Sequence, residues 1–261
     1  MKQMKFFLVA LMTVVMSVSV TSCMNGDDNT IRQREAIAKC ISTYPPTFQF
    51  ESGQKFVVDD MSLLTLETGS LYYFIYEFDS AEQDENSSTL NVKIISGAPS
   101  KVDADVNEGP TNITESTKAN APLFTFNADL STQPFDRYDQ QYIVIPVVYW
   151  VKVEGTSEDQ KKEFDKHSFI LTYDEDEIGA DATELVLTLN HVINTTGEEN
   201  VTRDRYTATY KAYRLDYALS AFSSKTGGKK PTKITIKAKV NASRNDLSGA
   251  TDATPWTYTF K

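Results

Sequence analysis

Short runs of alternating apolar and polar residues recur along this chain, and they constrain its fold more than any other feature. The clearest run covers residues 232–240, where Ile234, Ile236 and Ala238 alternate with lysine and threonine. Successive side chains of a strand point to opposite faces of the sheet, so this run predicts a strand with one buried face. Similar runs cover residues 89–95 and 184–191. Many short strands with almost no helical periodicity predict an all-β sandwich or barrel.

The strand-like segments divide into two groups. Residues 127–139 are polar and contain a proline, and they separate an N-terminal β domain over 45–135, a barrel or a small sandwich, from a C-terminal one over 136–261. Hydrophobic residues make up 40% of the chain and include 14 Phe and 13 Tyr, enough for two apolar cores. Within the segment that precedes these domains, residues 31–41 carry a thin apolar stripe, which we interpret as a short helix.

The first 22 residues are typical of a secretory signal peptide. Lys2 and Lys5 precede an apolar run over 6–20, which matches the usual signal core of about 7–15 apolar residues. A spanning helix needs roughly 20 apolar residues, so the run is short for a permanent anchor. The tetrapeptide that ends at Cys23 resembles the lipobox of bacterial lipoproteins, which implies cleavage before Cys23 and its acylation. Residues 23–44 are then expected to be the lipidated cysteine and a tether.

Acidic residues follow the candidate lipidation site. Asp27 and Asp28 resemble the export tag of Bacteroidetes surface lipoproteins, so we expect attachment to the outer membrane and exposure at the cell surface. Acyl chains such as palmitate would supply the membrane contact. The net charge of −10 argues against nucleic acid as a partner, because phosphate binding requires clustered Lys and Arg. With Cys23 acylated, Cys40 has no partner within the chain for a disulfide.

The C-terminal half is similar to a known family. The similarity rests on ordered, patterned segments, and it implies a lipoprotein signal, an N-terminal OB-like β-barrel and a C-terminal antiparallel β-sandwich. The family is the NigD-like lipoproteins of Bacteroidetes, whose biochemical role is not established, so no catalytic or cofactor residue follows from it. The segments that carry the resemblance are residues 166–171, 184–191, 214–217, 233–236 and 256–260.

Few residues suggest metal chemistry. His167 and His191 are the two histidines of the chain and lie near the ends of different predicted strands. A zinc site would require them to meet beside a carboxylate, whereas hydrogen-bonded strand-end histidines need no metal. Residues 174–185 resemble an EF-hand loop, but Leu185 stands where a bidentate Glu is required. We therefore expect no metal site and no cofactor.

Other candidate sites are aromatic, basic or modifiable. Trp150 and Trp256 are candidate sugar platforms, although their apolar neighbours favour a place in the core. The lysines between 225 and 239 are candidates for binding a polyanion, but the alternation of residues 232–240 places the last three, Lys233, Lys237 and Lys239, on the wet face of a strand. Ser80 lies in the tripeptide Asp79-Ser80-Ala81, which resembles the O-glycosylation motif of Bacteroidetes exported proteins.

No sequence motif of catalysis is found: the chain has no phosphate-binding loop, nucleophile elbow or zinc-protease helix. The prediction is therefore a non-enzymatic, lipid-anchored envelope protein that binds an unidentified protein or glycan. The alternatives are a carbohydrate-binding accessory protein and a subunit of a pilus or fimbria.

Overall fold

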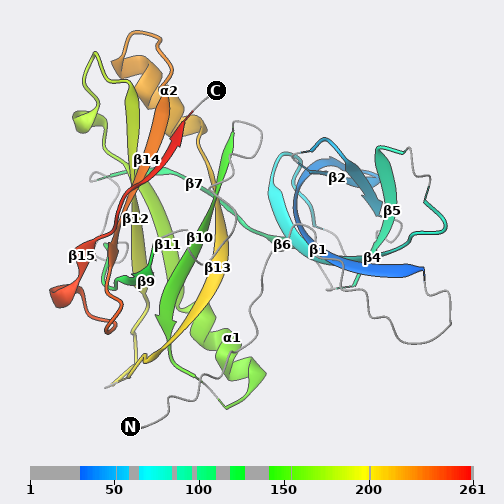
Figure 1. The fold of residues 1–261 in the computed structure, drawn as a ribbon, viewed down its shortest axis with the longest axis horizontal. Coiled ribbons are helices and arrows are strands. Elements are labelled where there is room, and N and C mark those ends of the chain that lie inside the picture. The colour runs from blue at the N-terminus through cyan, green and yellow to red at the C-terminus, as the bar shows by residue number, and fades with distance from the viewer. Residues whose placement is uncertain are drawn as a thin grey trace. The chain divides into compact units, whose positions relative to one another are not determined.

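The computed structural model describes residues 30–50, 52–58, 65–83, 87–95, 99–109, 118–126, 141–153, 155–199 and 201–259. They form two compact units, one ending at Asp103 and the other beginning at Ala104 (Figure 1). This boundary corrects the expected one at 135/136. Val106, Leu123 and Phe126 are buried in the core of the second unit, so the irregular stretch before residue 127 belongs to that unit.

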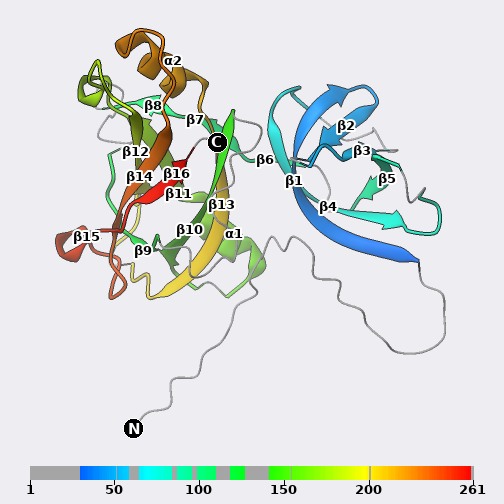
Figure 2. The ribbon, with the colours of Figure 1, turned by 45° about the horizontal axis from the view of Figure 1, so that its top comes forward.

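The first domain is a closed barrel. Its strand order is β1-β2-β3-β5-β4, and β4 pairs back onto β1, while the short β6 pairs with β4. Figures 1 and 2 show these strands curling into a ring. A five-stranded barrel of this kind is typical of the OB fold, so the OB-like prediction is confirmed. The strands are β1 (Ile31–Thr43), β2 (Pro46–Gln49), β3 (Lys55–Val58), β4 (Leu71–Asp79), β5 (Thr89–Ile94) and β6 (Ser100–Lys101).

The expected helix over residues 31–41 is wrong, because these residues form most of strand β1. Ala36, Ala38 and Cys40 alternate into the barrel core and are almost completely buried. These small side chains provide a weak apolar signal in the sequence. Pairing of β1 with β4 along nine residues decides the conformation instead. The expected tether over 23–44 is therefore also too long, since its last part belongs to the barrel.

Aromatic side chains fill the barrel. Phe48, Phe56 and Phe74 are fully buried, and the rings of Phe48 and Phe74 lie 4.7 Å apart. Tyr76 packs against Phe56 at a similar distance. Burying one large apolar side chain contributes roughly 1.5–3 kcal/mol, so this cluster supplies much of the stability of the first domain.

The second domain is a β-sandwich. Its strands follow the path β7-β13-β10-β9-β14-β12-β11-β8, with β15 and β16 also paired to β14. The path folds over at β14, whose first residues pair with β12 and whose last residue, Val240, pairs with Leu123 of β9. The strands are β7 (Asp103–Asp105), β8 (Asn107–Glu108), β9 (Leu123–Thr125), β10 (Tyr142–Val151), β11 (His167–Tyr173), β12 (Glu184–Ile193), β13 (Arg205–Arg214), β14 (Lys233–Val240), β15 (Thr251–Asp252) and β16 (Trp256–Thr259).

One core lies between the two layers of the sandwich. Strands β10, β12 and β14 contribute their inward-facing residues to it, and those of β12 and β14 follow the alternation that the sequence predicts. Strands β12 and β14 run parallel, so the sandwich is mixed where an antiparallel one was expected. A parallel pair needs a crossover connection, and β13 with α2 provides it. The inward-facing residues include Ile143, Ile145, Val147, Leu185, Leu187, Leu189, Ile234, Ile236 and Ala238.

Two short helices interrupt the strands of the second domain. Helix α1 (Ser157–Asp165) connects β10 to β11, and helix α2 (Asp216–Lys225) connects β13 to β14. They lie at opposite ends of the sandwich in both views (Figures 1 and 2). Two 3-10 turns, η3 (Glu175–Glu177) and η4 (Leu247–Gly249), follow β11 and β14. No helix among the residues described is long and apolar enough to cross a membrane.

Candidate functional site

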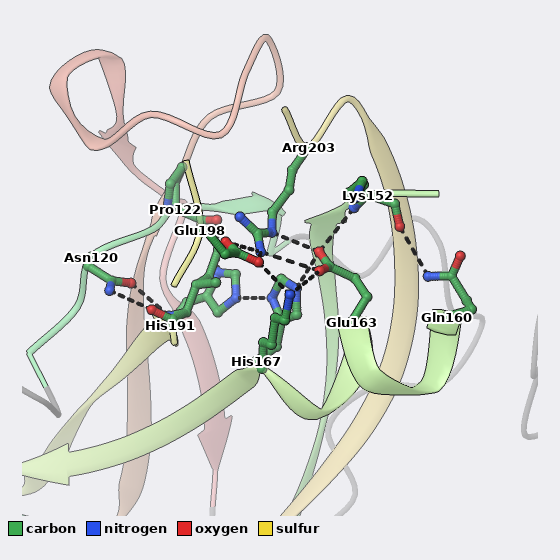
Figure 3. A network of polar contacts seen from close by, with 11 residues as sticks. Asn120, Pro122, Lys152, Gln160, Glu163, His167, His191, Glu198 and Arg203 are labelled. Carbon is green, nitrogen blue, oxygen red and sulfur yellow. Dashed lines mark hydrogen bonds and ion pairs between the residues drawn. The ribbon is translucent and has the colours of Figure 1, made fainter. Parts of the chain in front are cut away.

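The two histidines meet inside the second domain. Strands β11 and β12 pair with Phe169 opposite His191 and with His167 opposite Ile193. His167 and His191 are therefore diagonal neighbours on the same face of the sheet, within reach of each other. His167 Nδ1 lies 2.9 Å from His191 Nε2 (Figure 3). The sequence alone could not assign this pairing, because it depends on the register of the two strands.

Helix α1 brings a carboxylate to this pair. Thr156 caps the helix by accepting a hydrogen bond from the Asp159 backbone N–H. The helix orients Glu163 toward the interior, and Glu163 Oε1 lies 3.3 Å from His167 Nε2. The backbone N–H of Lys152 donates to the same oxygen at 3.1 Å. Glu163 therefore ties α1 both to the end of β10 and to the start of β11.

An arginine and a second glutamate complete the network. Arg203, just before β13, donates from Nε to Glu163 Oε1 at 2.7 Å and from a terminal nitrogen to Glu198 at 2.9 Å. Lys166 forms an ion pair with Glu198 as well. Figure 3 shows Arg203, Glu163 and Glu198 grouped around the histidine pair. Sequence reasoning missed Glu163 and Arg203, since nothing in the local pattern distinguishes them from surface charges.

The far side of the pair is held by backbone atoms. His191 Nδ1 lies 3.0 Å from the carbonyl oxygen of Pro122. Asn120 accepts from the backbone N–H of Ile193 at 2.7 Å and donates to its carbonyl at 2.8 Å. The segment before β9 is thus fastened to the end of β12.

This network is deeply buried. The exposed fraction is 1% for Glu163, 2% for His191, 6% for His167 and 7% for Arg203. Removing one partner of a buried ion pair strands the other charge without water and typically costs 3–5 kcal/mol. The position of helix α1 therefore depends on the contacts of Glu163 with Arg203 and His167.

Burial shifts the titration of these groups. It lowers the pKa of His191 to about 3, although the Pro122 carbonyl partly offsets the effect. Burial likewise lowers the pKa of His167 to about 4, with partial compensation by Glu163. For Glu163, burial raises the pKa, but hydrogen bonds from the Lys152 N–H and Arg203 outweigh it and hold the carboxyl below its ordinary pKa.

The arrangement does not resemble a metal centre. In the part of the chain that the structure describes, no group of three or more His, Cys, Asp or Glu residues is placed to hold a metal ion. The ring nitrogens of His167 and His191 face hydrogen-bond partners, and the Glu163 carboxylate already accepts a hydrogen bond from Arg203. What the cluster can do chemically is hold and redistribute protons among its own members.

The acidic loop after β11 is a 3-10 turn. Asp174 accepts a hydrogen bond from the backbone N–H of Asp176 at 2.9 Å and thereby caps η3. Glu175 forms an ion pair with Lys225 of α2. Four of the carboxylates that resemble a calcium loop in sequence, those of Asp174, Glu175, Asp181 and Glu184, thus have partners within the protein. Lys229, Lys233 and Lys239 of the 225–239 group form ion pairs as well.

Trp150 is buried outside the core of the sandwich and Trp256 only packs against that core, so the expected core positions hold in part. Trp150 is 6% exposed, and its indole N–H donates to the carbonyl of Asn241 at 2.9 Å. Trp256 is partly buried and packs against the sandwich core. The exposed aromatic residue nearby is Tyr206, which stacks on Phe124 with ring centroids 4.3 Å apart. The sequence contains no signal that separates Tyr206 from the other tyrosines of β13.

The modification candidates are placed differently. Ser80 lies in an exposed turn directly after β4 of the barrel, and its hydroxyl donates to the carbonyl of Thr30 at 2.8 Å. The Asp79 carboxylate accepts from the Ala81 N–H and closes the turn. Cys23, Asp27 and Asp28 lie outside the described residues.

Comparison with solved structures shows likenesses that span most of the chain. A candidate lipoprotein from Bacteroides fragilis NCTC 9343 is 26% identical to this chain, with a TM-score of 0.72 over 88% of this chain and 99% of that one. A protein of unknown function, DUF1344, from Bacteroides vulgatus ATCC 8482 is 14% identical over 89% of this chain and 92% of that one, with a TM-score of 0.48. An uncharacterised protein from Parabacteroides merdae ATCC 43184 is 11% identical over 87% and 98%, also with a TM-score of 0.48.

Sequence comparisons add no family name. No family model matches the chain, and no curated protein matches it. None of the three structural neighbours is described as a NigD-like protein. The likeness to the Bacteroides fragilis protein covers both β domains, so the chain shares its architecture with a candidate lipoprotein.

Proposed function

We propose that this protein is a lipid-anchored protein of the outer membrane whose two β domains form a non-enzymatic binding or interaction module. The observation that carries the proposal is the combination of a lipobox-like sequence at Cys23 with a fold shared, over 88% of the chain, with a candidate lipoprotein. Two acyl chains on one cysteine provide stable anchoring, whereas one chain provides only reversible binding.

The buried network supports a non-enzymatic role. A catalytic acid or base must come within about 2.6–3.2 Å of a substrate proton. Both histidines and Glu163 are buried and face other protein groups, so they have no such access. Their contacts connect α1, β11 and β12, which is a structural task.

The location is tested with cells that express the wild type, Cys23→Ala or Cys40→Ala. Cys40 is buried in the barrel, so the Cys40→Ala variant is the matched control for loss of a thiol. Metabolic labelling with an alkyne fatty acid should mark the wild type and Cys40→Ala, but not Cys23→Ala. If the Cys23→Ala variant were labelled as strongly as the wild type, the proposed lipid anchor at Cys23 would be refuted.

Surface exposure is tested separately by protease treatment of intact cells. The wild type should be cleaved, and a variant with both Asp27 and Asp28 changed to Ala should be protected inside the outer membrane. Equal cleavage of the two proteins would show that the acidic pair does not direct export.

A glycan-binding role is the second candidate, and Tyr206 is the observation that favours it. Tyr206 is about half exposed and is held flat against Phe124, which presents an aromatic surface suited to stacking on a sugar ring. Binding to a glycan array should be lost in Tyr206→Ala and retained in Tyr217→Ala, whose side chain is similarly exposed on α2. An array without wild-type binding would remove this candidate.

The exposed turn at Ser80 is the place for the proposed O-glycan. Intact-mass measurement of protein from its native host should show a glycan on the wild type and none on Ser80→Ala. The Ser80 hydroxyl donates to Thr30, so the variant also loses one hydrogen bond, and a thermal melt must accompany the measurement.

A further inference from the structure

The protonation of the buried histidine pair can be worked out from its outermost contact. The carbonyl oxygen of Pro122 can only accept a hydrogen bond, and it lies 3.0 Å from His191 Nδ1. His191 must therefore carry its proton on Nδ1. In the neutral ring the other nitrogen, Nε2, is then an acceptor.

This assignment sets the state of the second ring. His191 Nε2 faces His167 Nδ1 at 2.9 Å, so His167 must donate from Nδ1. The two ring planes differ by only 20°, and their centroids lie 5.2 Å apart, as expected when the rings are joined end to end by a straight N–H···N bond. A neutral His167 consequently has no proton on Nε2.

The third contact is left without a proton. His167 Nε2 faces Glu163 Oε1 at 3.3 Å, the longest of the three contacts. That oxygen already accepts from Arg203 Nε and from the Lys152 N–H, so it is a carboxylate oxygen and not a donor. Three contacts require three protons, whereas two neutral imidazoles carry two. The contact that lacks a proton is therefore the one between His167 Nε2 and Glu163 Oε1.

We propose that the His167–His191 pair is a proton-operated latch, in which His167 Nε2 takes up one proton and thereby binds helix α1 to strand β11 through Glu163. The proton comes from a buffer acid or from hydronium, which loses it as the Nε2–H bond forms. His167 Nε2 then donates a charge-assisted hydrogen bond to Glu163 Oε1, and such bonds are roughly twice as strong as neutral ones. The positive charge is shared by both rings through the short N–H···N bond.

Charged and aromatic groups on the elements packed against the histidine pair set the pH at which His167 takes up the proton. Glu163 on α1 and Glu198 favour the added charge, whereas Arg203 and Lys166 oppose it. From β10, the ring of Tyr149 lies 4.7 Å from the His167 ring. From β13, Lys211 lies over the ring of Phe169, which in turn stacks on His191, and Lys211 adds a further opposing charge. With the anions and cations nearly balanced, burial dominates, and uptake occurs well below the pH at which an exposed histidine titrates.

The experiment is nuclear magnetic resonance of the full purified protein with 15N-labelled histidine. The chain contains two histidines, so only two rings give signals. Long-range 1H–15N spectra identify which nitrogen carries the proton. At pH 7 we expect both rings as the Nδ1–H form, with a coupling across the N–H···N bond. On acidification the His167 Nε2 signal should move toward the protonated position, and both rings should follow one titration curve. A His167 ring in the Nε2–H form at pH 7, or two independent titrations in the ordinary histidine range, would overturn the proposal.

A substitution tests the role of the carboxylate. In Glu163→Gln the amide oxygen keeps accepting from Arg203 Nε and the Lys152 N–H, but the negative charge beside His167 Nε2 is lost, so the proton affinity of the pair should fall about tenfold or more. Glu158→Gln removes a carboxylate from the exposed face of the same helix and should leave the titration unchanged. An unchanged titration in Glu163→Gln would contradict the latch. If that variant does not fold, the proton positions measured in the wild type still decide the question.

Discussion

Acidification from pH 7 to pH 5 is expected to destabilise the second domain through its two histidines. In the unfolded chain both rings titrate at the ordinary histidine pKa near 6.5. In the folded domain burial lowers these pKa values to about 4 for His167 and about 3 for His191. Below pH 6.5 the unfolded chain therefore binds protons that the folded domain does not bind, so the free energy of unfolding falls as the pH falls.

The magnitude follows from the number of protons involved. Each unit of pH below 6.5 removes up to about 1.4 kcal/mol per histidine, until the folded pKa is reached. Between pH 7 and pH 5 each ring contributes about 2 kcal/mol, which makes about 4 kcal/mol for the pair. Domains of this size have total stabilities of about 5–15 kcal/mol, so the expected change is large.

Urea denaturation followed by tryptophan fluorescence is the appropriate assay. Trp150 and Trp256 both belong to the second domain, so the signal reports this domain and not the barrel. A variant with His167→Asn and His191→Asn should have lost most of the dependence on pH, whatever its stability at pH 7. A wild-type free energy that changes by less than 1 kcal/mol between pH 7 and pH 5, or that rises, would refute the reasoning.

Three further results are expected. Replacing Arg203 by Ala strands Glu163 and should destabilise the second domain by about 3–5 kcal/mol, whereas Arg244→Ala removes an exposed ion pair and should change the urea midpoint little. Phe74→Ala opens a cavity in the barrel and should cost about 3–5 kcal/mol in the barrel transition, monitored by tyrosine fluorescence, while the tryptophan transition stays in place. Cys40 is fully buried, and burial raises the pKa of its thiol, so a thiol reagent should label it in urea and not in the folded protein.

The strands of the second domain were predictable because their own residues carry the signal. Residues 184–191 and 232–240 alternate between apolar and polar side chains, and the structure places β12 and β14 there. Residues 31–41 show the opposite case. Their inward-facing positions hold Ala36, Ala38 and Cys40, which bury little area, so local pattern underestimates a strand that the ladder with β4 stabilises.

The domain boundary was misjudged for a related reason. The stretch from 97 to 121 has no periodicity in its sequence. It nevertheless contains β8, which pairs with β11, and Val106, which is buried in the core of the second domain. A strand of two residues is too short to show a period. Its place is set by the partner strand, which lies more than sixty residues further along the chain.

By itself, the sequence determined the all-β class, the positions of strands β5, β12 and β14 and the lipobox-like segment at Cys23, because periodicity and short motifs are local properties. Only the tertiary structure decided that residues 31–41 close the barrel as part of strand β1 and that the two histidines share a buried network. Glu163 and His167 are only four residues apart in the sequence, but Arg203, which binds the same carboxylate, is 40 residues away from Glu163. Such contacts depend on strand register and on burial, which remove water and shift the pKa values, and neither can be read from a single stretch of residues.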